Sequence, residues 1–136
     1  MTILITGADG YLGWPTSLRI ASRTDDRVVL VDNFGRREWV SEVGSVSATP
    51  VADIETRLEA AEEVHGLTNL SFVEGDLTDR AFVDELLQVH EPDTIVHTAA
   101  QPSAPYSQIN GERANFTQHN NMQATRNLAF GLEENG

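Results

Sequence analysis

The chain has 136 residues, nine of them basic and 21 acidic, and its formal net charge is −12. This length suits about one domain, and a hydrophobic share of 40% is enough for a packed core. A surface this acidic repels nucleic-acid phosphates, and no apolar run reaches the roughly 18 residues of a membrane helix. Because cysteine is absent, disulfides and thiolate metal sites are excluded. We therefore expect a cytoplasmic protein without nucleic-acid or membrane partners.

All nine basic residues are arginines, and lysine does not occur. Two interpretations fit this composition: a generic acidic enzyme, or a protein adapted to concentrated salt. Salt screens the self-repulsion of such a chain within a few ångströms, while the carboxylates keep it soluble. The absence of lysine favours a halophilic source.

Short apolar runs alternate with amphipathic stretches along the whole chain. Helical spacing joins Tyr11, Trp14, Leu18 and Ala21, and Asp79 is typical of a helix N-cap. The interval 34–69 carries no strong strand signal, and 99–111 reads as a polar loop. The expected strands are 2–6, 27–31, 70–73 and 94–97, and the expected helices are 11–23, 50–65, the stretch after Asp79, and 113–134.

This alternation predicts an α/β fold with a parallel sheet, right-handed crossovers and helices on both faces. We expect the strand order 3-2-1-4, the beginning of a doubly wound, Rossmann-type sheet. The whole chain, 1–136, then forms one cofactor-binding domain. Because its fourth strand would be an unpaired edge, association with another chain is expected, most simply as a homo-oligomer.

A glycine-rich turn lies between the first expected strand and helix. Gly7, Gly10 and Gly13 follow the spacing G-x-x-G-x-x-G. The first glycine permits the tight turn, the second leaves room for a pyrophosphate, and the third lets the helix approach the sheet. The amides and dipole of the helix start then favour a negative ligand. This context predicts a dinucleotide site rather than a structural turn.

Asp32 ends the second expected strand, where a carboxylate accepts hydrogen bonds from both adenosine ribose hydroxyls. A 2′-phosphate would be repelled there, so NAD is favoured over NADP. Arg36 and Arg37 argue mildly for a phosphate clamp, although they also suit a solvated loop. We predict NAD as the cofactor.

Other polar residues have both a functional and a structural interpretation. Asp76 follows the third strand and either reaches the adenine amino group or turns the chain. The small side chains of Ala99 and Ala100 would let a cofactor pass close to the backbone. His119 fits a substrate contact and a position on the helix face equally well, and His97 is interpreted as structural. No set of His, Asp and Glu has metal-site spacing, so no metal is expected.

Several segments together resemble the extended short-chain dehydrogenase/reductase family, which includes nucleotide-sugar epimerases and dehydratases. They are T-G-x-x-G-x-x-G, Asp32-Asn33, G-D-L-T-D and V-H-T-A-A. A narrower resemblance, to the UDP-sulfoquinovose synthase subgroup, rests on D-G-Y-L-G-W, Thr49-Pro50-Val51 leading to Arg57, S-A-P-Y-S and T-Q-H-N-N. The resemblance covers nearly the whole chain.

The resemblance implies an NAD-dependent enzyme acting on a UDP-sugar. In the synthase subgroup, UDP-glucose is oxidised at C4, water leaves across C5–C6, sulfite adds at C6, and the hydride returns to C4. The implied partners are a UDP-sugar substrate and sulfite. A nucleotide-sugar 4-epimerase or 4,6-dehydratase is the alternative within the enzyme class.

The resemblance also assigns roles to particular positions. The residues expected at the cofactor are Gly7, Gly10, Tyr11, Leu12, Gly13, Asp32, Asn33, Arg36, Arg57, Asp76, Leu77, Ala99, Ala100, Gln101 and Asn121. Gln101, Ser103 and Tyr106 are expected at the sugar, together with His119.

The chain departs from the family pattern in ways that affect function. Pro102 stands where the synthases have arginine, and Ala124 replaces a glycine of the last helix. The Tyr-x-x-x-Lys of the family is absent, so we expect no catalytic residue here and interpret the chain as an inactive N-terminal fragment. A non-catalytic NAD-sensing module, working through its open sheet edge, is the alternative outside the enzyme class.

Overall fold

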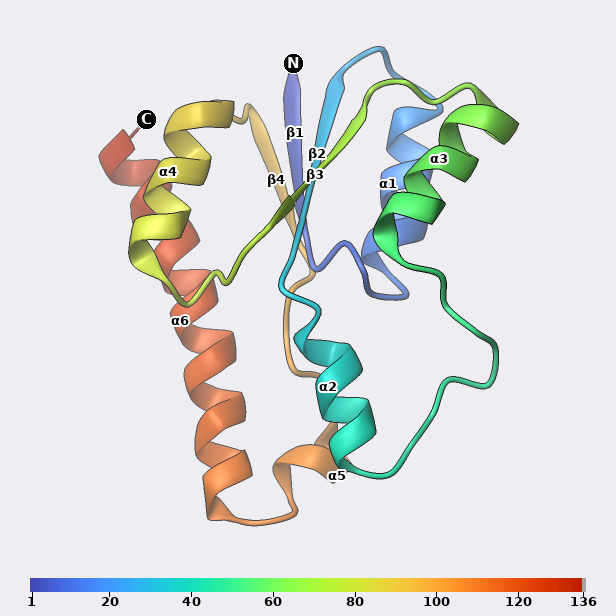
Figure 1. Cartoon of the computed structure of the whole chain (residues 1–136). Helices are drawn as coiled ribbons and strands as arrows, with labels where there is room; N and C mark the ends of the chain where they lie inside the picture. Colours follow the sequence, from blue (N-terminus) through green and yellow to red (C-terminus); the bar gives the residue numbers. More distant parts are fainter. Residues whose placement is uncertain (136) are drawn as a thin grey trace.

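The computed structural model describes residues 1–135 and shows one parallel sheet with the strand order β3-β2-β1-β4. Helices α1 and α3 lie on one side of this sheet, and α4 and α6 lie on the other (Figure 1). The strands are β1 (Thr2–Thr6), β2 (Arg27–Asp32), β3 (Leu70–Glu74) and β4 (Thr94–His97). The helices are α1 (Gly13–Ala21), α2 (Gly35–Glu42), α3 (Ile54–His65), α4 (Arg80–His90), α5 (Ala104–Ser107) and α6 (Gly111–Asn135). The predicted α/β fold and strand order are confirmed.

Strands β1 and β2 are buried on both faces, because each is a continuous run of β-branched and leucine residues. Successive side chains enter opposite layers. Leu4, Val29 and Val31 pack toward α4 and α6, whereas Ile5 and Leu30 pack toward α1. The sheet therefore separates two apolar cores, and this fixes the carboxyl ends of its strands at one common edge.

Two predicted helix starts and one predicted buried face need correction. Helix α1 begins at Gly13 rather than at Tyr11, whose side chain is 70% exposed. Its buried face is formed by the small residues Gly13, Ser17 and Ala21 instead of the large ones. Helix α3 begins at Ile54 rather than at residue 50, because the Asp53 side chain accepts a hydrogen bond from the Thr56 amide and so caps the helix.

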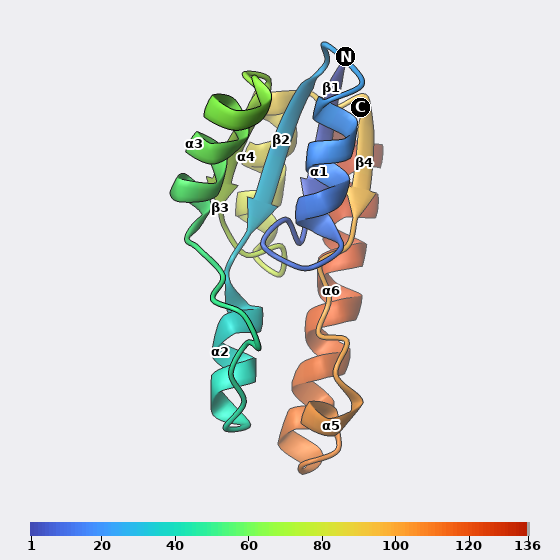
Figure 2. The same cartoon turned by 90° about the vertical axis from the view of Figure 1, so that its right-hand side faces the viewer.

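Two helices were not predicted. Helix α2 follows β2 within the interval 34–69, and α5 is a short turn of helix inside the expected polar loop 99–111. Helix α2 is poor in apolar residues and α5 has only four residues, so neither sequence carries a clear helical stripe. Together with the first half of α6 they extend below the sheet (Figure 2).

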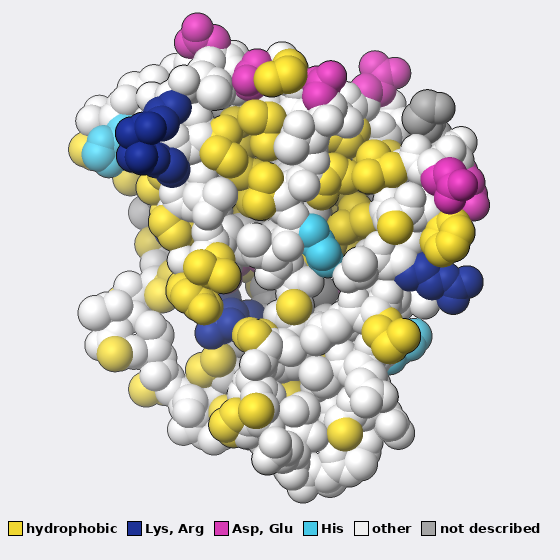
Figure 3. Space-filling model, turned by 180° about the vertical axis from the view of Figure 1, so that it is seen from behind, with side chains coloured by type: hydrophobic (Ala, Val, Ile, Leu, Met, Phe, Trp, Pro, Cys, Tyr) yellow, Lys and Arg dark blue, Asp and Glu magenta, His cyan; other side chains and the backbone are white. Residues whose placement is uncertain are grey.

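The strands β3 and β4 form the two edges of the sheet. On the face that Figure 3 presents, hydrophobic side chains gather in the upper half and acidic side chains lie along the upper rim. Within residues 1–135, no helix is both long enough and apolar enough to cross a membrane.

Candidate functional site

The turn between β1 and α1 is fixed by close contacts between backbone segments. Gly7 has a φ of +73°, and a Cβ there would lie 2.6 Å from the Ala99 nitrogen. A Cβ on Gly13 would lie 2.1 Å from the Gly7 carbonyl oxygen. A side chain at either position would collide with backbone, so glycine is required. Helix α1 starts without a side-chain cap. The Trp14 amide donates to the Gly10 carbonyl at 3.1 Å, and Pro15 has no N–H. The amides of Leu12 and Gly13 are therefore those that can bind a ligand.

Asp32 lies at the end of β2, beside this turn. Its Oδ2 accepts a hydrogen bond from the Asp9 amide at 2.9 Å, and its Oδ1 accepts one from the Phe34 amide at 2.7 Å. Burial raises the pKa of the Asp32 carboxyl, and these two amide donors lower it in part. The carboxylate is thus held in one orientation, with lone pairs left to accept hydrogen bonds from a ligand.

A pocket opens where the carboxyl ends of the strands meet the glycine turn. Such a crevice, next to a reversal in strand order, is where α/β sheets bind ligands. Helix α2, the segment after β3 and α6 also contribute to its walls. The residues that line the pocket are Gly7, Gly10, Tyr11, Leu12, Gly13, Val31, Asp32, Asn33, Arg36, Trp39, Gly75, Asp76, Leu77, Thr98, Ala99, Ala100, Pro102, Asn120 and Ala124.

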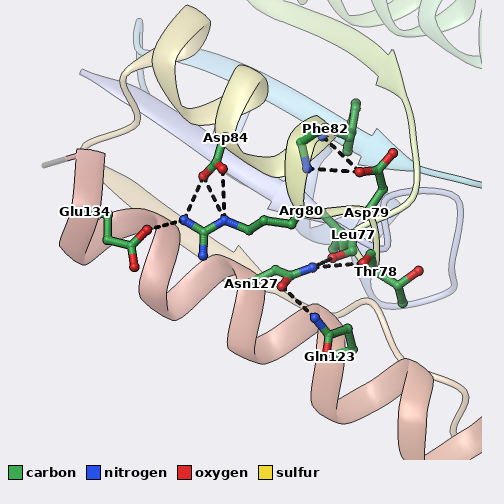
Figure 4. A network of polar contacts seen from close by, with 10 residues as sticks. Leu77, Thr78, Asp79, Arg80, Phe82, Asp84, Gln123, Asn127 and Glu134 are labelled. Carbon is green, nitrogen blue, oxygen red and sulfur yellow. Dashed lines mark hydrogen bonds and ion pairs between the residues drawn. The ribbon is translucent and has the colours of Figure 1, made fainter.

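The segment after β3 is braced from behind by Asn127 of α6 (Figure 4). The buried Asn127 amide donates to the carbonyl oxygens of Leu77 at 2.8 Å and Thr78 at 3.0 Å. Gln123 donates to its Oδ1 at 2.8 Å. A Cβ on Gly75 would lie 2.1 Å from the Phe82 ring of α4. The segment 75–78 is therefore held by contacts from both α4 and α6, and it forms a firm wall of the pocket.

The structure brings most of the predicted cofactor residues together. Those that line the pocket are Gly7, Gly10, Tyr11, Leu12, Gly13, Asp32, Asn33, Arg36, Asp76, Leu77, Ala99 and Ala100. Arg57 does not line it: its guanidinium contacts Asp9 and lies 4.5 Å from the centre of the Trp14 ring. Gln101 and Asn121 also lie outside the lining.

The residues predicted at the sugar stabilise the segment that joins β4 to α6. Asn121 accepts a hydrogen bond from the Gln101 amide at 2.7 Å and donates to the Gln101 carbonyl at 3.1 Å. Gln101 Oε1 accepts from the Ser103 amide, and Ser103 Oγ accepts from the Tyr106 amide. His119 is exposed on α6. None of these side chains lines the pocket, and their predicted contacts with substrate stay predictions.

Tyr106 is buried where α2, α5 and α6 meet. Its hydroxyl donates to Glu42 at 3.1 Å and accepts from Arg113 at 2.5 Å, and its ring packs near those of Trp39 and Phe116. Burial raises the pKa of the Tyr106 hydroxyl. In this chain Tyr106 therefore joins three helices.

Several pocket residues were missed by the sequence analysis. Trp39 comes from a helix that has no motif. Asn120 lies in the T-Q-H-N-N segment, between the predicted His119 and Asn121, and Thr98 precedes the predicted Ala99. The signal that could have found Trp39 is its position shortly after Asp32. It lies in the stretch that follows the strand carrying the predicted ribose-binding acid. The missed lining residues are Val31, Trp39, Gly75, Thr98, Pro102, Asn120 and Ala124.

The residues present fit a dinucleotide. The side of the turn toward the pocket carries no side chain at Gly10, so a diphosphate can approach the backbone. The carboxylate of Asp32 lies beside the turn, where the adjoining ribose would be. Among residues 1–135, no group of three or more His, Asp and Glu side chains could hold a metal ion.

The fold and the pocket thus define the dinucleotide-binding part of a Rossmann-type protein. Comparison with known families makes this specific: residues 3–136 match the NAD dependent epimerase/dehydratase family. The chain belongs to this family, and the predicted recognition of epimerase/dehydratase enzymes is confirmed.

Two relatives are named as UDP-sulfoquinovose synthases. The protein from Sulfolobus acidocaldarius is 42% identical over 125 residues, which cover 92% of this chain and 31% of that protein. The chloroplastic protein from Spinacia oleracea is 39% identical over 132 residues, which cover 97% of this chain and 27% of that protein. The chain therefore spans between a quarter and a third of the length of these curated relatives.

Solved structures share the fold. A UDP-glucose-4-epimerase from Stenotrophomonas maltophila, solved with NAD and formylated UDP-arabinopyranose, has a TM-score of 0.74. It is 24% identical, and the match covers 100% of this chain and 34% of that one. The predicted cofactor, NAD, is that of the family.

Proposed function

We propose that this chain is the cofactor-binding part of an enzyme that uses NAD to modify a nucleotide sugar. The observation that carries the proposal is the juxtaposition of the uncapped start of α1 with the fixed carboxylate of Asp32 at one pocket. The first-turn amides suit a diphosphate. The carboxylate suits two ribose hydroxyls and repels a 2′-phosphate. NAD, when bound, supplies a reversible acceptor for a hydride from the sugar.

The pocket-lining residues predicted at the cofactor are proposed to bind NAD. Among them, Asp32 would accept hydrogen bonds from the ribose and Asp76 would contact the adenine amino group; the support is that both line the pocket. Gln101, Ser103, Tyr106 and His119 are proposed to act at the sugar in the whole enzyme. Family membership favours an enzyme over an NAD-sensing module.

For the whole enzyme we propose UDP-sulfoquinovose synthase activity, with a UDP-sugar and sulfite as substrates and a homo-oligomeric assembly. The support is the identity of 42% and 39% to two synthases over at least 92% of this chain. That match includes the long interval after β2, which packs beside the pocket through α2 and Trp39.

A 4-epimerase or 4,6-dehydratase is the second candidate. Pro102 lines the pocket where the synthase resemblance has an arginine, so a cation that would suit sulfite is missing at this point. A UDP-glucose 4-epimerase from Rhizobium leguminosarum bv. trifolii is 36% identical over 73% of this chain.

An assay of the full-length parent protein separates these candidates. The protein is incubated with UDP-glucose, with and without sulfite, and the nucleotide sugars are identified by mass spectrometry and chromatography. Synthase activity gives a sulfonated UDP-sugar only when sulfite is present. Formation of a UDP-hexose epimer or a 4-keto-6-deoxy sugar in both arms would contradict the synthase proposal.

We also propose that the protein works in a salt-rich cytoplasm. The support is the charge of −12 with arginine as the only basic residue type. Refolding in dilute and in molar potassium chloride tests this, because salt screens repulsion between carboxylates. Higher stability in molar salt is expected, and equal stability in both would contradict it.

A further inference from the structure

Asp9, in the middle of the glycine turn, holds two arginines at once. Its two carboxylate oxygens accept hydrogen bonds from Arg37 Nε and Nη2, both at 2.7 Å, in a bidentate pair. One of these oxygens also accepts a hydrogen bond from Arg57 Nη2. The Asp9 side chain is only 6% exposed. The spacing G-x-x-G-x-x-G does not itself require an acid at this position.

Both arginines are also held by other contacts. Arg57 is 13% exposed and stacks 4.5 Å above the Trp14 ring. Arg37 donates a further hydrogen bond to the Ala52 carbonyl at 3.0 Å, and its guanidinium lies 5.7 Å from the Phe34 ring centre. The guanidinium groups thus have defined positions beside the turn, outside the pocket lining.

This cluster lies next to the Asp32 carboxylate, which is proposed to bind the ribose. The Asp9 amide donates to Asp32 Oδ2 at 2.9 Å, so the two acids are neighbours. The hydrogen bond to Asp9, and after it the charges of Asp9 and Asp32, raise the pKa of Arg37. An Arg37 guanidinium released from Asp9 would therefore be drawn toward Asp32, where a 2′-phosphate of NADP would lie.

We propose that Asp9 is a specificity-determining residue, which favours NAD over NADP by keeping Arg37 and Arg57 away from the ribose 2′ position. The inference rests on the proposed binding of NAD at this site. A 2′-phosphate is recognised best by a guanidinium with free donors in a planar fork. Asp9 occupies that fork in Arg37, and it adds a second negative charge beside Asp32.

Removing the charge of Asp9 acts on NADP in two favourable ways. A released Arg37 can pair with the 2′-phosphate directly. If it pairs with Asp32 instead, it neutralises the carboxylate that repels the phosphate. Both outcomes raise the affinity for NADP relative to NAD. A purely structural role of Asp9 would weaken both cofactors together and leave their ratio unchanged.

The test is calorimetric titration of the full chain with NAD⁺ and with NADP⁺, for wild type and for Asp9→Asn. We expect the NADP/NAD affinity ratio to rise about tenfold or more, the value of one charge-assisted hydrogen bond. Adding Arg37→Met to Asp9→Asn should return the ratio toward wild type. The matched control is Glu134→Gln, which also removes one carboxylate from an arginine pair, 2.6 Å from Arg80 and remote from the pocket (Figure 4).

The outcomes are distinct. An unchanged ratio in folded Asp9→Asn, or an equal rise in Glu134→Gln, overturns the inference while the proposed function stands. Absence of NAD⁺ binding by wild type overturns both. Should Asp9→Asn fail to fold, Arg37→Met alone decides: because Arg37 is already occupied, NADP affinity should change by less than about threefold, and a larger loss specific to NADP overturns the inference.

Discussion

The two ends of the candidate site are built in different ways. At the glycine turn, backbone atoms of β1, α1 and the segment after β4 meet so closely that no Cβ fits at Gly7 or Gly13. At the other end, residues 101–106 are held by side-chain hydrogen bonds, among them Asn121 to Gln101. Near the turn, polar groups remain available to a ligand, whereas at the other end the side chains of Gln101, Ser103 and Asn121 bind backbone groups of the segment itself. The turn end is thus already formed within this chain.

This difference predicts that substitutions at the turn will lower the free energy of unfolding most. Gly13→Ala places a Cβ 2.1 Å from the Gly7 oxygen. We expect a loss of about 3 kcal/mol in the free energy of unfolding, because the helix must move away from the sheet. Urea unfolding followed by circular dichroism measures it. The control is Gly111→Ala, where a Cβ meets nothing within 4 Å and the change should lie within about 1 kcal/mol; similar losses in both would contradict the account.

The hydrogen bonds from Asn127 to the segment after β3 are the next test. Asn127→Leu leaves the carbonyl oxygens of Leu77 and Thr78 without their donor. We expect a loss of about 2 kcal/mol in unfolding free energy, and weaker NAD⁺ binding because the wall of Asp76 and Leu77 loosens. Gln123→Leu, which removes the bond to Asn127 only, should cost about half as much. A variant at Asn127 with wild-type stability would show that these hydrogen bonds are unimportant.

The sequence predicts the glycine turn better than it predicts the rest of the site. The glycine spacing and the position of Asp32 are local patterns, so the turn, the sheet order and most of the cofactor lining were predictable. Trp39 lines the pocket because α2 comes to lie beside it, and no local pattern encodes that. Asn120 belongs to the T-Q-H-N-N segment, but the segment does not reveal which of its residues faces the pocket. Arg57 was expected at the cofactor, but the neighbouring Asp9 binds it. Such pairings depend on tertiary distance, which spacing along the chain does not reveal.

A third test measures how the free energy of unfolding depends on pH. It concerns the junction between the sheet and α6. The His97 ring bonds Thr6 Oγ1 at 2.7 Å and Thr125 Oγ1 at 3.2 Å, and desolvation lowers its pKa from 6.5. A lowered pKa contributes stability that is present above pH 6.5 and is lost as the pH falls through the folded-state value. The free energy of unfolding should therefore fall more steeply from pH 7 to pH 5 in wild type than in His97→Gln. Parallel curves would contradict this.

The smallest effect is expected below the sheet, where α2 meets α6. Glu42 and Arg113 form an ion pair at 2.7 Å, with side chains 41% and 34% exposed. Glu42→Gln should cost about 0.5 kcal/mol or less, and NAD⁺ affinity should stay within about twofold of wild type. A tenfold loss of affinity, measured by calorimetry, would show that this junction controls the cofactor pocket and would remove the contrast between the two ends.

The role of Asp32 tests the central claim most directly. Calorimetric titration of the chain with NAD⁺ should give saturable heat, and Asp32→Asn should lower the affinity about tenfold or more, because a charged acceptor of two ribose hydroxyls is lost. Asp25→Asn, on the exposed turn before β2, removes the same charge and should leave the affinity unchanged. No heat with NAD⁺ from the folded wild-type chain, or equal affinity for wild type and Asp32→Asn, would contradict the account.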